Sequence, residues 1–110
     1  MLFINNIKVF IKSKVICQFR IELFHIEPVI WRMIEVPFDY SFWDLHVAIQ
    51  DAMGWLDYHL HSFVFNKDKR KKPIEIGLPE SEDDEKFLPG WEIPIKAYFT
   101  EPGDEAIYKY

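Results

Sequence analysis

Three histidines in the middle of the chain are the side chains best suited to chemistry. His59 and His61 are two residues apart on a predicted strand, so their side chains point to the same face, and His46 lies on a predicted helix before them. Imidazole is a common ligand of zinc and other transition metals, although such a site needs a third or fourth group. A divalent metal such as zinc is therefore one interpretation of the trio. A second interpretation, which the sequence favours, is that these histidines are hydrogen-bonded core residues packed beside Trp55 and Phe63. A third is acid–base chemistry.

Trp31 and Arg32 are a second candidate, because a guanidinium beside an indole can stack on a base or hold an anion. Adjacent side chains on a strand face opposite ways, so strand geometry alone does not place both in one site. Arg32 is expected on the helix-facing side, paired with a helix carboxylate such as Asp44, and this structural role is favoured over a ligand contact. Trp31 and Met33 are expected on the other face. The candidate binding residues are these three with Trp55.

Nucleophilic and phosphate chemistry find little support elsewhere. Cys17 has the parity of a buried strand position, which predicts an inert thiol, and no serine lies in a glycine elbow. The glycines are isolated, so the sequence offers no phosphate-binding loop. The acidic run at 80–85 lacks the alternating spacing of an EF-hand loop and is interpreted as solvated. The sequence therefore favours a protein that is not an enzyme.

Length and composition predict one folded domain over residues 1–110, since 49% of the residues are hydrophobic and 17% are aromatic. The net charge of −5 argues against nucleic acid as a partner. One cysteine cannot form an internal disulfide, which fits a reducing compartment. Lysines interrupt the apolar N-terminus before a signal peptide or a membrane span is complete. We therefore expect a cytoplasmic protein with no membrane association.

Residues 17–66 predict a strand–strand–helix–strand core. The second strand is apolar on both faces, so something should cover each side. Ser41 and Asp44 are spaced as an aspartate version of the capping box, and Gly54 supplies a left-handed helix end. The predicted elements are strands at 17–25, 29–36 and 59–66 and a helix at about 42–53. Residues 1–16 are an extra strand, an arm, or a doubtful start.

The rest of the chain is predicted to be a charged, loop-rich insertion at 67–92 followed by a C-terminal segment at 93–110. The basic run at 67–72 is interpreted as solvated, with nucleic-acid contact as the weaker alternative. The predicted elements here are a short strand at 74–76, a helical turn at 94–99 and a strand at 105–110.

This order is typical of an α+β, β-grasp-like fold, in which a hairpin is followed by a helix across a mixed sheet and by further short strands. Trp31 and Met33 then lie on the far side of the sheet, where residues 67–110 or a partner chain would cover them. The predicted core residues are Phe19, Ile21, Ile34, Val36, Leu45 and Ile49.

The sequence resembles the plasmid pRiA-type ORF-three-like proteins, a family associated with plasmids and transposons. The shared motifs cover about 17–65; they are QFRIEL at 18–23, Pro28-Val29-Ile30-Trp31-Arg32, Val36-Pro37, Leu45-His46 with Ile49-Gln50, Met53-Gly54-Trp55, and His59-Leu60-His61 with Phe63. The family pattern continues with a Tyr-x-Tyr-Asp-Phe-Gly-Asp-x-Trp run, and this chain ends where that run would begin. The resemblance therefore implies a C-terminally truncated form.

The resemblance implies an α+β domain whose molecular role is uncharacterised. Together with the aromatic sheet face, it leads us to expect a non-enzymatic binding or accessory module that engages a protein partner or a second copy of itself. The alternative is a metal-dependent hydrolase, acting on nucleic acid, in which His46, His59 and His61 feed a site completed by residues beyond the chain end.

Overall fold

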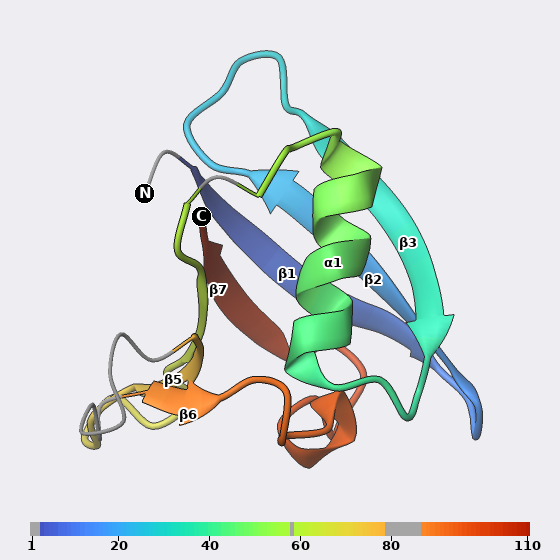
Figure 1. Ribbon diagram of the computed structural model, residues 1–110, viewed down its shortest axis with the longest axis vertical. Helices are drawn as coiled ribbons and strands as arrows, with labels where there is room; N and C mark the ends of the chain where they lie inside the picture. The colour runs from blue at the N-terminus through green and yellow to red at the C-terminus, as the bar shows by residue number, and fades with distance from the viewer. Residues whose placement is uncertain (1–2, 58, 79–86) are drawn as a thin grey trace.

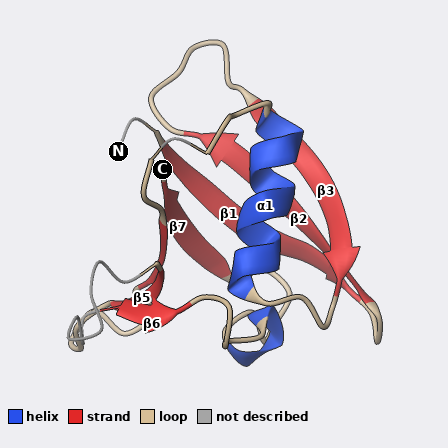
Figure 2. Ribbon diagram, viewed as in Figure 1, coloured by secondary structure: helices blue, strands red, loops and turns tan. Residues whose placement is uncertain are grey.

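The protein is described by a computed structural model over residues 3–57, 59–78 and 87–110. Within these ranges one α-helix and one 3-10 helix accompany a single mixed sheet (Figure 1; Figure 2). The strands are β1 (Ile4–Lys12), β2 (Ile16–Leu23), β3 (Trp31–Pro37), β4 (Ser62–Phe65), β5 (Ile74–Gly77), β6 (Phe87–Pro89) and β7 (Glu105–Lys109); the helices are α1 (Phe42–Met53) and η1 (Ile95–Ala97). The predicted α+β class is confirmed.

The strands lie in the order β3-β2-β1-β7-β4-β5-β6, and every neighbouring pair is antiparallel except β5 and β6. The predicted hairpin of the strands at 17–25 and 29–36 is the pair β2 and β3. The sequence leaves three alternatives open for residues 1–16: an extra strand, an arm or a doubtful start. Most of these residues form an extra strand, because β1 pairs with both β2 and β7. Reciprocal backbone hydrogen bonds of 2.7 and 2.9 Å join Phe3 and Tyr110, so the first and last described residues lie side by side.

Helix α1 forms where the capping pattern predicts it. The backbone N–H of Asp44 donates to Ser41 Oγ at 3.1 Å, and the Ser41 N–H donates to the Asp44 carboxylate at 3.0 Å. Gly54 ends the helix at φ 70°, a left-handed conformation that glycine adopts without a Cβ clash. The helix crosses one face of the sheet, over β1, β2 and β3 (Figure 1).

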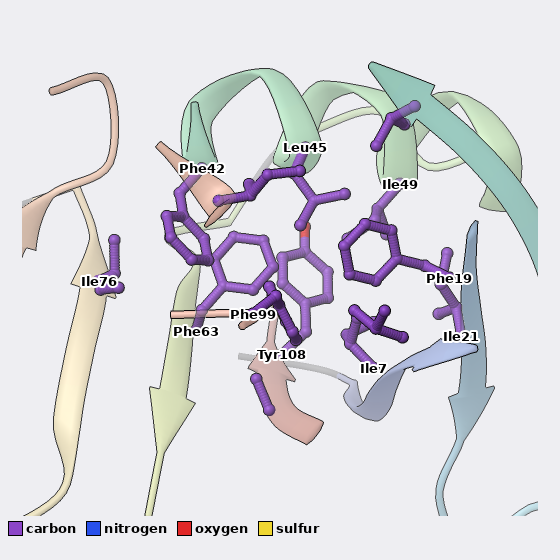
Figure 3. Close-up of a cluster of buried hydrophobic side chains, with 14 of the residues drawn as sticks. Ile7, Phe19, Ile21, Phe42, Leu45, Ile49, Phe63, Ile76, Phe99 and Tyr108 are labelled. Atoms are coloured by element: carbon purple, nitrogen blue, oxygen red, sulfur yellow. The ribbon is translucent and has the colours of Figure 1, made fainter. Parts of the chain in front are cut away.

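The hydrophobic core lies between α1 and this face of the sheet (Figure 3). All the predicted core residues belong to it, with Ile34 only partly buried. Its buried aromatic members include Phe42 from the helix, Phe63 from β4 and Tyr108 from β7. The final strand thus contributes a central core residue, which its place at the end of the chain did not suggest.

The described part of residues 67–110 leaves Trp31 and Met33 on the opposite face of the sheet uncovered, so the first of the two expected covers is not seen there, and a partner chain stays a prediction. Strands β5, β6 and β7 extend the sheet sideways, and Ile95 and Phe99 pack into the core on the helix side. Trp31 and Met33 consequently remain 46% and 41% exposed. The acidic run at 80–85 lies outside the described residues. In the described ranges, no helix is long and apolar enough to cross a membrane.

Candidate functional site

A closed ring of four hydrogen bonds lies at the junction of α1, the loop after it and β7. His46 Nδ1 is 2.7 Å from Tyr108 Oη, and His46 Nε2 is 2.9 Å from Asp57 Oδ1. Gln50 Nε2 donates to Tyr108 Oη at 2.8 Å, and the Asp57 backbone N–H donates to Gln50 Oε1 at 3.0 Å. Each of the four residues is therefore hydrogen-bonded to two others, in one bond through the Asp57 backbone, and the ring ties the helix to the sheet.

The local sequence explains how these groups meet. His46 and Gln50 are four residues apart on α1, so both point from the same helix face. Asp57 has φ 56°, a conformation uncommon for residues with a Cβ but better tolerated by aspartate than by most, and this turns its carboxylate back toward the helix. The Tyr108 hydroxyl points toward the helix from the sheet (Figure 3).

The ring allows one assignment of protons. The Asp57 carboxylate can only accept, so His46 Nε2 carries the hydrogen of that bond. Nδ1 of the neutral imidazole then accepts from the Tyr108 hydroxyl, whose oxygen accepts from Gln50. Burial lowers the pKa of His46, and the Asp57 carboxylate offsets this only in part. Burial also raises the pKa of Tyr108 well above its usual value of 10, so both groups are neutral at pH 7.

His61 stacks on His46, with ring centroids 3.5 Å apart and planes 7° from parallel. Burial, and then the charge that His46 would carry, lower the pKa of His61 to about 3. Its Nε2 is buried and has no hydrogen-bond partner among the described residues. Two neutral rings can stack at this distance, whereas two imidazolium rings would repel each other.

The third histidine of the predicted metal site lies apart from this pair. Strand β4 begins only at Ser62, so the same-face geometry predicted for His59 and His61 does not apply. His59 instead packs edge-on against Tyr110, with centroids 5.3 Å apart. Across the described ranges, no three His, Cys, Asp or Glu side chains are grouped closely enough to hold a metal ion. His46 would also have to give up one of its two hydrogen bonds to ligate a metal.

The geometry of the ring suits a structural tie better than a reaction centre. His46 and Tyr108 are fully buried, so neither can reach a substrate without local opening of the fold. The carboxylate of Asp57 is the part of the ring that reaches solvent, with its side chain 45% exposed. Sequence reasoning considered His46 but missed Gln50, Asp57 and Tyr108 as its partners. The spacing of Gln50 four residues after His46 was the only signal for any of them.

The candidate binding residues fall on different surfaces. Trp31 lies on the face away from the helix, where the Arg20 guanidinium sits 4.4 Å from its ring centroid. Arg32 is on the helix side but exposed, and its Nη1 donates to the Trp31 carbonyl at 2.8 Å. The expected pair between Arg32 and Asp44 is not formed, because Asp44 serves the helix cap. Trp55 stacks on the rings of Phe3 and Tyr110, with centroids 4.8 and 5.2 Å away, on the helix side of the sheet.

Strand β3 is an open edge of the sheet, since β2 is its sole strand neighbour among the described residues (Figure 1). The backbone N–H of Leu23 donates to the Ile30 carbonyl, and this bond sets the backbone pattern of β3. The N–H and C=O groups of its even-numbered residues bond to β2, and those of its odd-numbered residues point away from β2, toward the open edge. The outward backbone groups belong to Trp31, Met33 and Glu35. Arg32 occupies one of these acceptors, the carbonyl of Trp31, and the others form no hydrogen bond to any residue that the structure describes.

Comparison with known proteins identifies relatives of unknown function. The uncharacterized protein y4hQ of Sinorhizobium fredii (strain NBRC 101917 / NGR234) is 34% identical over 67 residues, which are 61% of this chain and 31% of that protein. The crystal structure of the protein of unknown function MM3350 from Methanosarcina mazei Go1 matches with a TM-score of 0.70 and 34% identity, over 96% of this chain and 52% of that chain. This chain therefore spans about half of the solved relative and about a third of the curated one.

The predicted family is confirmed by a match to the family described as plasmid pRiA4b ORF-3-like protein, which extends over residues 15–110. The match begins just before β2 and includes α1, the ring residues and β7. This chain belongs to the plasmid pRiA4b ORF-3-like protein family.

Proposed function

We propose that this chain is a non-enzymatic binding module that engages an extended strand of a protein partner along the edge of β3. The observation that carries the proposal is an exposed apolar run ending in an open strand edge. Every residue from 25 to 33 is exposed, including Ile30, Trp31 and Met33. An edge of this kind is a template for strand addition, which proteins usually block with charge, proline or a covering segment.

The side chains next to the edge favour a protein over other ligands. Trp31 and Met33 project on the same face of β3, so an added strand would pack its own alternate side chains beside them. The Arg20 guanidinium holds the Trp31 ring in place through a cation–π contact, which reduces the entropy lost on binding. Tryptophan and methionine are enriched at the centres of protein interfaces.

Paired substitutions test the proposal. Met33→Lys should remove a binding contact, and Val47→Lys is its matched control, because Val47 is also 41% exposed but lies on α1. Tagged protein would be recovered from the native host with each substitution and compared with the wild type by quantitative mass spectrometry. A partner depleted at least tenfold by Met33→Lys and retained by Val47→Lys supports binding at β3. Equal recovery by both variants contradicts it.

Light scattering separates a partner from a second copy. The molar mass would be measured between 5 and 200 μM, roughly the range over which weak dimers form. If the mass of the wild type doubles over this range and that of Met33→Lys stays monomeric, the strand added to β3 comes from a second copy of this chain. A strict monomer that recovers no partner from the host would refute the binding module.

A further inference from the structure

A small pocket lies far from β3, between the β4–β5 hairpin and η1. Its volume is about 260 Å³. Its apolar walls come from Phe65 at the end of β4, Ile74 at the start of β5, Ala97 at the end of η1 and Tyr98 directly after it. The rings of Phe65 and Tyr98 are 5.3 Å apart and tilted by 38°, so two aromatic faces meet at the pocket.

Lysines surround this apolar pocket. Lys67, Lys71 and Lys72 all line it. Lys71 and Lys72 form no ion pair within the described ranges, although both are exposed and the protein is acidic overall. Residues 67–72 carry five basic side chains and one aspartate, a net +4, so the rest of this −5 chain carries −9. Three of these basic side chains line the pocket together with Asp68, and Asp68 is itself paired with Arg70 at 3.2 Å, so Lys71 and Lys72 supply its unpaired positive charge within the described ranges.

One wall of the pocket is held by a partly buried carboxylate, that of Asp104. Asp104 accepts hydrogen bonds from the backbone N–H groups of Thr100 and Glu101 at 2.8 and 2.9 Å, and from Lys67 Nζ at 2.9 Å. Burial opposes ionisation of Asp104, but these donors outweigh it and lower its pKa to about 2. The hairpin is thus tied to the turn at 100–104 at neutral pH, and the pocket is preformed.

We propose that this pocket binds an acidic peptide segment of a protein, with one apolar side chain between Phe65 and Tyr98 and flanking carboxylates at Lys71 and Lys72. The volume lies below the roughly 300–1,000 Å³ of pockets that hold whole small-molecule ligands, which favours a single side chain. A nucleic acid carries about one charge per 1.7 Å of duplex and would meet the −9 of the remaining chain. A short acidic peptide avoids most of that repulsion.

The test is fluorescence anisotropy with a labelled synthetic peptide, Gly-Glu-Asp-Phe-Glu-Asp-Gly. Two matched peptides separate the contribution of the apolar side chain from that of the carboxylates. In one, serine replaces phenylalanine, and in the other, glutamine and asparagine replace glutamate and aspartate. We expect the parent peptide to bind at least tenfold more tightly than either, and to weaken as salt is raised from about 50 to 200 mM. Amide chemical shifts should change at Phe65, Ile74 and Tyr98.

Two protein variants place the binding. Lys71→Glu with Lys72→Glu should lower the affinity at least tenfold, while Lys14→Glu with Lys96→Glu makes the same change of charge at two residues that line a different pocket. Ala97→Phe should also block the peptide, and Ala97 is exposed, so the substitution should leave the fold intact.

Any of three outcomes overturns the proposal. They are equal loss of affinity in both charge-reversed proteins, shifts confined to residues outside this pocket, and tighter binding of a single-stranded oligonucleotide of equal charge. Neutralising the acidic residues at 80–85 tests whether they compete with the peptide for the pocket. The affinity for the peptide should then rise or stay unchanged, and a tenfold fall in that affinity would also contradict the proposal. None of the substituted residues belongs to the β3 edge, so failure of the pocket proposal leaves the proposed function at β3 standing. Failure of the proposed function likewise leaves the pocket proposal standing.

Discussion

Removal of one hydroxyl, by Tyr108→Phe, tests the hydrogen-bond ring most sharply. The Tyr108 oxygen accepts from Gln50, and its hydrogen is donated to His46 Nδ1, so the substitution leaves two buried polar groups without partners. Each such group costs about 1–3 kcal/mol. Because the rings and the backbone keep their places, we expect a loss near the lower end of the sum, about 3 kcal/mol. That is a large part of the roughly 5–15 kcal/mol that stabilises a domain of this size.

Urea unfolding followed by tryptophan fluorescence measures this loss. With a slope of about 2 kcal/mol per molar urea, the midpoint should fall by about 1.5 M. Tyr98→Phe is the matched control, because Tyr98 is half-buried against Phe42 and Phe65 and its hydroxyl has no hydrogen bond within the described ranges. It should change stability by less than about 0.5 kcal/mol. If both variants unfold at the same urea concentration, the ring does not stabilise the fold and the proton assignment has no support.

Four further predictions follow from individual contacts. The pKa of His61 is lowered from 6.5 to about 3 in the folded state, so the unfolded chain binds a proton at a higher pH than the folded protein does. The free energy of unfolding should therefore be greatest above about pH 6.5 and fall toward pH 3. In His61→Phe it should fall less steeply, which urea midpoints measured across this pH range would show. Gly77→Ala should cost about 1–3 kcal/mol by chemical denaturation, because a Cβ there meets the His61 carbonyl oxygen at 2.5 Å, whereas Gly90→Ala meets nothing closer than 3.5 Å and should cost less. Asn5→Leu should raise the thermal midpoint, because both amide atoms of Asn5 are buried with no partner in the described part of the chain; a lowered midpoint would show that the amide is satisfied in solution. Equimolar zinc should leave the thermal midpoint of this chain unchanged, since both ring nitrogens of His46 are engaged, and a rise of several degrees would favour the metal site.

Local chemistry made the helix and the adjoining hairpin predictable. Ser41, Asp44 and Gly54 are residue types whose side chains, or lack of one, act on the backbone within a few positions, so their roles follow from spacing alone. The alternation from Cys17 to Leu23 likewise fixes the buried face of β2 without knowledge of its neighbours.

The remaining features depend on contacts between distant parts of the chain. His46 meets Tyr108 across 62 positions, and nothing in either residue's neighbourhood specifies the other. The sheet position of β7 depends on pairing with β1, whose asparagines and lysines obscure its alternation. Asp57 in a left-handed conformation is invisible to spacing rules, which look for glycine there. These are the points at which tertiary pairing decides the structure.

The β3 edge itself is the central claim, and amide hydrogen exchange tests it most directly. The backbone N–H groups of Trp31, Met33 and Glu35 point outward and should exchange quickly in the free protein, while those of Arg32 and Ile34 are protected by β2. In complex with the partner recovered at β3, the three outward amides should become protected by at least tenfold. If these three exchange equally fast in the free and bound protein, the partner does not add a strand to β3 and the proposed function is wrong.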